Sequence, residues 1–373
     1  MINLIYIGSD IGNITLNALE AIRDSDIIMN YDNLDLTELD YFLKDKEIIS
    51  TIEESDSASS DSNESIYSKL EQSYSKIELS ISKSFDNNLT LICSNDSNIQ
   101  AISNLLIQIS SKYHDVKLKI YPGVSPIDYT ASILGAPLND FVAINLNNPI
   151  VSSTELENKI NLAIENNLVL FIHNLIDKLN LINNEDKFHN FKKLKEIITN
   201  FNNELLVGIV NRDSYEICQF KDIDEGKLEE NSTLIIGNKL TYQIDDYMIT
   251  SSDYIVEPKF ISYNMEFFEK YLNGESPKGL DYDCDYLPCH KSLEACDFCY
   301  CPFYPCADGI TGGLWIKDKG VWSCQNCDWI HLEKPCQYIR EGLDDILEDV
   351  DDLKNKHIEL LKLRRRCLLK TLK

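Results

Sequence analysis

The cysteines of this chain are concentrated in one short stretch of sequence. Nine of the twelve fall between Cys284 and Cys336, and only Cys93 and Cys218 precede them. Two Cys-x2-Cys pairs, with further cysteines and histidines between and around them, are typical of metal sites with four thiolate or imidazole ligands. The candidate ligands, enough for two tetrahedral sites, are Cys284, Cys289, His290, Cys296, Cys299, Cys301, Cys306, Cys324, Cys327 and His331.

A site ligated only by thiolates leaves no open position for catalysis, so we expect structural zinc, with an iron–sulfur cluster as the alternative. Metal binding contributes ~10–16 kcal/mol in zinc-finger peptides, enough to fold a module too small to close its own core. We expect Trp315, Trp322 and Trp329 to supply its apolar packing. No segment resembles a signal peptide, which predicts a cytoplasmic, reducing compartment where these thiols bind metal instead of forming disulfides.

The bulk properties limit the partners. At 373 residues the chain should hold two or three domains, and its formal net charge is −26. Nucleic acids and anionic membranes both attract basic surfaces, so we expect neither as a partner. No apolar run is long enough to cross a bilayer.

Apolar strand-like runs alternate with helical stretches along the first 256 residues. This alternation predicts an α/β fold with mainly parallel sheets, whose ligands bind at the carboxyl ends of the strands. The predicted strands are 3–8, 89–93, 117–121, 141–146, 168–173, 205–210, 216–220 and 232–237. The predicted helices are 15–24, 64–83, 97–112, 127–134, 153–165 and 187–200.

Several segments connect or follow these elements. The acidic, serine-rich segment 51–65 predicts either a mobile loop or the solvated start of a helix. Residues 121–123 predict a hinge between two lobes, and 273–278 a linker to the cysteine-rich module. Past Cys336 a heptad seam predicts a helix, and we favour packing of this seam within the chain over pairing between chains. The seam residues are Ile339, Leu343, Ile346, Val350, Leu353, His357 and Leu360.

Five segments carry a family resemblance. The segment 123–138 (GVSPIDYTASILGAPL) resembles the hinge and following helix of the tetrapyrrole (corrin/porphyrin) methylases, and most of all the ring-contracting carbon-17 methyltransferases of precorrin-3B or cobalt-factor III. Segments 141–150, 206–210, 232–238 and 248–254 continue the resemblance in the expected order. In addition, 289–306 and 320–331 resemble a cysteine-rich small domain presumed to bind metal.

The resemblance implies a fold and a reaction. It implies a body of two α/β lobes, at 1–120 and 121–256, with S-adenosylmethionine bound in the cleft between them. A linker (257–283), a zinc-binding module (284–336) and a C-terminal helix (337–373) would follow. A corrin or other tetrapyrrole intermediate would be methylated, by positioning of reactants more than by side-chain chemistry. The family also implies a homodimer, and the metal module a docking surface for other cobalamin-pathway enzymes or a metal-handling role.

The chain departs from the family pattern in its cofactor loops. The first loop reads Gly8-Ser9-Asp10-Ile11-Gly12, the second is residues 94–98 (SNDSN), and His173-Asn174-Leu175 replaces a Tyr-Asn-Pro segment. Each non-glycine residue held in a strained backbone region costs ~1–3 kcal/mol. Two hypotheses follow: the loops have re-formed around the same cofactor, or the cleft has lost catalysis and kept a binding or scaffolding role.

The family motifs indicate individual site residues. The candidates for cofactor binding are Gly8, Asp10, Ser94, Asn95, Asp96, Ser97, Asn98, Ser125, Pro126, Asn174 and Thr233. Asp96 and His173 are candidate catalytic residues, although Ser94 and Asp96 could instead cap the next helix and His173 could be structural. Arg23 and Arg212 are the only arginines among the first 339 residues, and Arg212 follows a strand. Arg212 is therefore our candidate for binding substrate carboxylates, with a surface salt bridge as the alternative.

Overall fold

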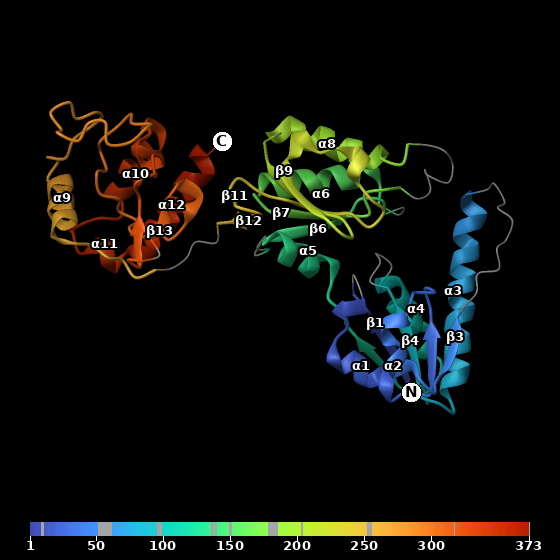
Figure 1. Ribbon diagram of the computed structural model, residues 1–373. Helices are drawn as coiled ribbons and strands as arrows, with labels where there is room; N and C mark the ends of the chain where they lie inside the picture. The colour runs from blue at the N-terminus through green and yellow to red at the C-terminus, as the bar shows by residue number, and fades with distance from the viewer. Residues whose placement is uncertain are drawn as a thin grey trace. The chain divides into compact units, whose positions relative to one another are not determined.

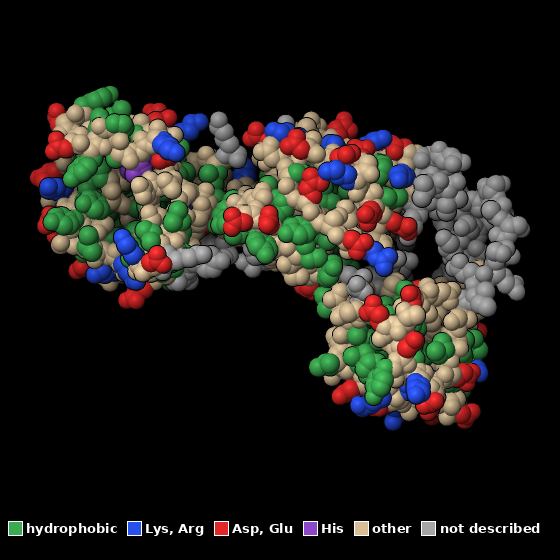
Figure 2. All heavy atoms as spheres, in the orientation of Figure 1, with side chains coloured by type: hydrophobic (Ala, Val, Ile, Leu, Met, Phe, Trp, Pro, Cys, Tyr) green, Lys and Arg blue, Asp and Glu red, His purple; other side chains and the backbone are tan. Residues whose placement is uncertain are grey.

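The computed structural model describes residues 1–8, 11–50, 62–94, 99–135, 138, 140–148, 151–177, 186–202, 204–251, 256–316 and 318–372. The chain forms two compact units, of which the first holds residues 1–136 and 140–236 and the second residues 137–139 and 237–373. Figure 1 shows the elements of each unit, and Figure 2 shows acidic side chains spread over the visible face. Among the described residues, no helix has the length and apolar character to span a bilayer.

The first sheet is fully parallel, with strand order β3-β2-β4-β1-β5. Its strands are β1 (Ile2–Tyr6), β2 (Ile27–Asn30), β3 (Glu47–Ser50), β4 (Leu89–Cys93) and β5 (Leu118–Tyr121). Side chains of β1 alternate between two buried clusters: Leu4 packs with α3 (Ser62–Ser84) and α4 (Ile99–Ser110), and Ile5 packs with α1 (Leu16–Arg23) and α2 (Asp40–Leu43). Helices therefore cover both faces, as a parallel sheet requires.

The second sheet is mixed, with strand order β6-β7-β10-β8-β9. Only β6 (Phe141–Asn145) and β7 (Val169–His173) pair in parallel; β8 (Leu206–Val210), β9 (Tyr215–Gln219) and β10 (Thr233–Ile236) pair antiparallel. Helices α6 (Ser153–Glu165) and α8 (His189–Asn202) pack together, and α5 (Pro126–Leu134) lies across the strands from them (Figure 1). The prediction of mainly parallel sheets is therefore wrong for the second sheet. Strand β9 follows β8 through a short turn, and β10 lies antiparallel between β7 and β8.

Strand direction decides which loops meet in the second sheet. Strand β10 runs antiparallel to both β7 and β8, so β7 and β8 run in the same direction. The carboxyl ends of β6, β7 and β8 and the start of β10 therefore lie along one edge. This edge brings the residues after β7 and β8 onto the same side of the sheet.

The second unit is organised around the cysteine-rich segment. It contains the hairpins β11 (Thr241–Ile244)–β12 (Tyr247–Thr250) and β13 (Leu314–Ile316)–β14 (Val321–Ser323), with helices α9 (Ser262–Leu272), α10 (Glu333–Asp344), α11 (Asp352–Asn355) and α12 (His357–Thr371). Phe268 of α9 and Leu360 of α12 share one buried cluster with Phe303 and Trp322 of the cysteine-rich segment. The module therefore closes its core with helices from both flanking segments. The described residues also form six 3₁₀ turns: Ile11–Asn13, Thr37–Leu39, Phe220–Asp222, Glu225–Lys227, Gly309–Thr311 and Trp329–His331.

Four local predictions need correction. The expected linker 257–283 contains α9, whose apolar side belongs to the core. The expected single C-terminal helix is divided into α10, α11 and α12, and between α10 and α11 Asp352 Oδ2 accepts hydrogen bonds from the Glu348 N–H at 2.8 Å and the Asp349 N–H at 3.4 Å. Trp315 is 46% exposed instead of buried. Strands β2 and β3 were not predicted.

Two further segments can be compared with their predictions. The seam packs within the chain, as we favoured: Ile339, Leu343, Leu353 and Leu360 are fully buried in the cluster of the second unit. Of the acidic segment 51–65, residues 51–61 lie outside the described residues and 62–65 belong to α3.

Candidate functional site

The two glycines at the carboxyl edge of the first sheet lie against each other. Gly8 follows β1 with a left-handed φ of 85°, and Gly123 follows β5. A Cβ atom on Gly123 would overlap the backbone nitrogen of Gly8 and lie 2.5 Å from the carbonyl oxygen of Tyr6. The first loop and the 121–123 segment therefore meet backbone to backbone, and no side chain fits between them.

A carboxylate organises the start of the second loop. Asp32, just after β2, accepts two hydrogen bonds from Ser94 through Oδ2: one from the backbone N–H at 2.7 Å and one from the hydroxyl at 3.1 Å. The sequence analysis missed Asp32, although an aspartate directly after an apolar run was the available signal. Ser94 is the only second-loop candidate within the described residues. Asp10, Asn95, Asp96, Ser97 and Asn98 all lie outside them.

Three candidates near the hinge have structural partners. Ser125 caps α5: its hydroxyl accepts a hydrogen bond from the Asp128 N–H at 3.1 Å, and Pro126 occupies the first turn. The hydroxyl of Thr233 lies 2.7 Å from that of Thr130, and this buried pair ties α5 to β10. The side chains of Ser125 and Thr233 thus hold the helix in place, and only their backbone groups remain to contact a ligand.

Asparagines form a chain of hydrogen bonds at the edge of the second sheet. Asn174 adopts a left-handed φ of 54° and donates from Nδ2 to Asn145 Oδ1 at 3.1 Å. Asn147 Nδ2 donates to the Asn174 carbonyl at 2.6 Å, and Asn190 Nδ2 donates to Asn147 Oδ1 at 2.8 Å. This network fixes the turn after β7. Sequence reasoning found only Asn174, because its partners come from β6 and α8.

His173 and Arg212 belong to the same edge of the second sheet. The His173 ring is half-buried and stacks on Phe171 with centroids 5.8 Å apart. Arg212 is exposed in the turn between β8 and β9, and its backbone N–H donates to Glu229 Oε2 at 3.4 Å. Within the described part of the chain the Arg212 guanidinium forms no ion pair, so the salt-bridge alternative finds no support there.

Eight cysteines of the second unit divide into two groups. Burial, followed by nearby Cys296, Cys289 and Cys284, raises the pKa of Cys299 to about 11. We call these four the first thiol group. Burial also raises the pKa of Cys301, and here the neighbours are Cys306, Cys324 and Cys327. These form the second thiol group.

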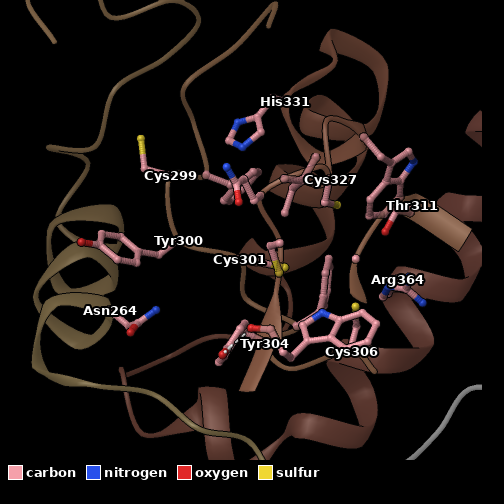
Figure 3. A pocket seen from close by; sticks show the side chains of 18 of the residues that line it. Asn264, Cys299, Tyr300, Cys301, Tyr304, Cys306, Thr311, Cys327, His331 and Arg364 are labelled. Atoms are coloured by element: carbon pink, nitrogen blue, oxygen red, sulfur yellow. Dashed lines mark hydrogen bonds between the residues drawn. The ribbon is translucent and has the colours of Figure 1, made fainter. Parts of the chain in front are cut away.

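The four cysteines of the second thiol group, together with Cys299 of the first, line a cavity of about 410 Å³ (Figure 3). Aromatic side chains, among them Phe298, Phe303 and Trp329, complete its lining. His290 and His331 lie at the same cavity with ring centroids 4.2 Å apart, and His331 Nδ1 lies 3.3 Å from the carbonyl oxygen of Ala295. Among the described residues, no three Cys, His, Asp or Glu side chains converge into a ready metal site. The donor types suit a thiophilic metal, but the thiols face a shared space without coordination geometry.

Comparison with known proteins identifies the family. Residues 3–215, more than half of the chain, match the family model of the tetrapyrrole (corrin/porphyrin) methylases. A "probable cobalt-factor III C(17)-methyltransferase" from Methanothermobacter thermautotrophicus is 34% identical over 99% of this chain and 100% of its own length. The chain belongs to the tetrapyrrole methylases.

Other similarities agree with this assignment. Residues 277–354 of this methylase match the model of a cysteine-rich small domain. A relative of the same description from Methanocaldococcus jannaschii is 28% identical over 47% of this chain and 74% of its own length. The crystal structure of the methyltransferase CobJ superposes with a TM-score of 0.52 and 15% identity, covering 67% of this chain and 99% of that one, which shows a shared fold.

Membership confirms the predicted class of fold and of reaction. The methylase has the α/β body and the cysteine-rich domain that the resemblance implied. It is a methyltransferase, and S-adenosylmethionine is the methyl donor of this family. The identities of the site residues and the boundaries of the domains stay predictions.

Proposed function

We propose that this methylase transfers a methyl group from S-adenosylmethionine to carbon 17 of cobalt-factor III, in the ring-contracting step of cobalamin biosynthesis. The observation that carries the proposal is the end-to-end match to a relative described as a cobalt-factor III C(17)-methyltransferase. Incubating the full chain with S-adenosylmethionine and cobalt-factor III tests it. The proposal requires a product heavier by one methyl group, and an unchanged pigment contradicts it.

The edge of the first sheet fits the methyl donor. The sulfonium group supplies an activated methyl, so the chain must mainly hold the reactants in line. Gly8 and Gly123 have no side chains, and their backbones meet at the carboxyl ends of β1 and β5. Asp32 holds Ser94, and with it the start of the second loop, at the neighbouring strand β4. These groups, with Asp10 and residues 95–98, would hold the cofactor.

The edge of the second sheet would orient donor and substrate. The asparagine network sets the backbone of Asn174, and Thr233 and Ser125 place the start of α5. His173, at the end of β7, and Asp96 are the candidates for proton transfer during methylation.

Arg212 is proposed to bind carboxylates of the tetrapyrrole. Its exposed guanidinium, without an ion pair among the described residues, can form bidentate hydrogen bonds to a carboxylate. We expect Arg212→Ala to weaken tetrapyrrole binding more than S-adenosylmethionine binding. Arg23→Ala is the matched control, since Arg23 already pairs with Asp24 at 2.9 Å on the surface. Equal loss of both ligands in Arg212→Ala would contradict the role.

We propose further that each thiol group binds one Zn²⁺ with a structural role. The donors in each group are four thiols, which Zn²⁺ prefers, with His290 and His331 as possible substitutes. Elemental mass spectrometry of the native protein should give two zinc ions per chain, and iron with sulfide would instead favour a cluster. A surface held by these metals would serve to dock other enzymes of the pathway.

The altered cofactor loops favour a second candidate function, a tetrapyrrole-binding or scaffold protein without catalysis. Residues 94–98 hold no glycine, whereas the family loop does. Titration calorimetry with S-adenosylmethionine separates the two. Binding at micromolar concentration supports the enzyme, and absence of heat at high cofactor concentration supports the scaffold. A homodimer and a cytoplasmic location are part of the proposal, and sedimentation and cell fractionation test them.

A further inference from the structure

Two buried nitrogen atoms at one cavity lack a hydrogen-bond partner among the described residues. They are His290 Nδ1 and Arg364 Nη2, and both side chains line the cavity of the second thiol group. The Trp322 side chain lines the same cavity and hydrogen-bonds the Cys324 thiol. An unpaired buried donor costs ~1–3 kcal/mol, so such a concentration indicates that acceptors belong in this space. Sulfur atoms of the second thiol group face the same space.

Arg364 is the charged member of this set and is held firmly. It lies on α12 with only 3% of its surface exposed. Its Nη1 donates to Asp308 Oδ2 at 2.8 Å, while Nη2 stays unpaired among the described residues. Asp308 is itself fixed by hydrogen bonds from the Ser251 hydroxyl at 2.6 Å and the Ile310 N–H at 3.2 Å. One edge of the guanidinium is therefore anchored, and the other is presented to the cavity.

The guanidinium is close to the sulfur atoms. Burial lowers the pKa of Arg364, but the charges of neighbouring Cys306 and Asp308 outweigh this effect and raise it. Figure 3 shows the Arg364 side chain entering the cavity beside Cys306. Four thiolates around one divalent cation carry a double negative charge, which is costly to bury unless a cation and N–H donors lie next to it.

We propose that Arg364 is a positioning residue for the metal of the second thiol group. Its Nη2 donates to a thiolate sulfur of that group, with Cys306 the first candidate, and its charge offsets part of the excess negative charge. This inference rests on the proposed binding of zinc by these thiols. It adds a residue that lies outside residues 277–354 matched by the cysteine-rich family model. Through Asp308 and Ser251 it also ties the metal site to the segment following β12.

The alternative is that Arg364 and Asp308 form a buried ion pair that only stabilises the fold. The second unit offers a matched control in Arg340, whose Nε donates to Asp297 Oδ1 at 3.0 Å and whose Nη2 donates to the Pro277 carbonyl at 3.1 Å. Arg340→Met removes an arginine from another largely buried ion pair but no donor from the cavity of the second thiol group.

The test uses the full chain loaded with Zn²⁺. Chelator competition gives the metal affinity, and alkylation followed by peptide mass spectrometry shows which cysteines lose protection first. Arg364→Met should weaken metal binding at the second thiol group by about 10–100-fold and expose its four cysteines first. The first thiol group should keep its protection. Arg340→Met should leave the second thiol group as protected as in the unaltered protein.

The inference is overturned if the second thiol group of Arg364→Met keeps its protection from alkylation. It is also overturned if both thiol groups lose protection equally in Arg364→Met and in Arg340→Met. Should Arg364→Met fail to fold, Arg364→Lys decides through Co²⁺ substitution. Lysine keeps the positive charge, so the metal should remain bound. It cannot donate to Asp308 and to a thiolate sulfur at the same time, so the thiolate loses a hydrogen bond. The thiolate-to-Co²⁺ absorption band should therefore shift to lower energy. An unshifted band overturns the inference. If the second thiol group of the unaltered protein holds no metal, the zinc proposal is overturned, and this inference with it.

Discussion

The Cα atom of Gly123 packs directly against the backbone of Gly8, joining the segment after β5 to the loop after β1. The two residues are far apart in the sequence, and each ends a strand at the same edge of the first sheet. Val124 adds a hydrogen bond from its N–H to the carbonyl of Asn13 at 3.4 Å. This junction fixes the positions of Gly8 and Gly123 at the edge of the first sheet.

The first prediction concerns this junction. Gly123→Ala should destabilise the first unit by about 1–3 kcal/mol and weaken S-adenosylmethionine binding, because the added methyl meets backbone that cannot move aside. Chemical unfolding followed by circular dichroism and calorimetry measure the two effects. Gly12→Ala is the control for stability alone, because Gly12 belongs to the first cofactor loop and no described atom lies within 4 Å of its Cβ position. Wild-type stability and affinity in Gly123→Ala would refute the prediction.

A second prediction concerns Asp32. Asp32→Ala removes the acceptor for two hydrogen bonds of Ser94, and hydrogen bonds to charged groups contribute ~1.5–3 kcal/mol. We expect S-adenosylmethionine affinity to fall about tenfold if part of this energy positions the second loop. Asp35→Ala is the control, because among the described residues Asp35 bonds the nearby Thr37 and no part of the second loop. Similar affinities in the two variants would rule out this role for Asp32.

Asn174 allows a backbone effect to be separated from a side-chain effect. Asn174→Gly loses the bond to Asn145 but tolerates the left-handed φ, whereas Asn174→Ala loses the bond and is strained. The alanine variant should therefore be less stable than the glycine variant by about 1–2 kcal/mol. Chemical unfolding followed by circular dichroism measures the difference. Equal stability of the two variants would mean that the turn relaxes.

Metal removal should unfold the second unit selectively. All three tryptophans lie there, so their fluorescence reports on this unit alone. A chelator should change tryptophan emission while helix and sheet signals from the first unit persist. Because burial raises the pKa of Cys299 to about 11 and of Cys324 to about 12, metal must displace protons and its binding should weaken as pH falls. Unaltered emission after complete metal removal would exclude a structural role.

A fifth prediction concerns His357, which is 6% exposed at the start of α12. Burial lowers its pKa below the ordinary 6.5, although the Val256 backbone opposes this. The folded state therefore favours the neutral His357 ring. The stabilisation from keeping this ring neutral is complete above pH 6.5, and it is lost as the pH falls toward the lower pKa of the folded state. His357→Leu should flatten the decline in stability between about pH 7 and 5, measured by tryptophan fluorescence in urea. An unchanged slope would argue against this assignment.

Much of the body could be predicted because its elements are local. Strand β4 and helix α6 appear at their predicted positions, since apolar runs and periodicity depend on neighbouring residues. Strand pairing was not predictable in the same way. The antiparallel placement of β10 between β7 and β8 depends on contacts between distant segments, and it decides that Asn174 and Arg212 share an edge.

In the candidate site, too, the residue types could be predicted from the sequence but their neighbours could not. Cys299 and Cys301 are two residues apart yet belong to different thiol groups, which spacing alone does not reveal. Asp32, Asn145 and Arg364 were missed because each acts on a residue from another element. An isolated charged residue in a sequence gives no sign of the partner that it will meet.

The sequence by itself determined the family, the two kinds of module and the types of ligand that the cysteine-rich segment offers, since all three are written in local motifs. Only the tertiary structure decided which cysteines face one another, that Gly8 meets Gly123, and that Arg364 reaches the second thiol group from α12. The physical reason is that these relationships arise from packing between segments distant in sequence, where burial and steric exclusion select the neighbours.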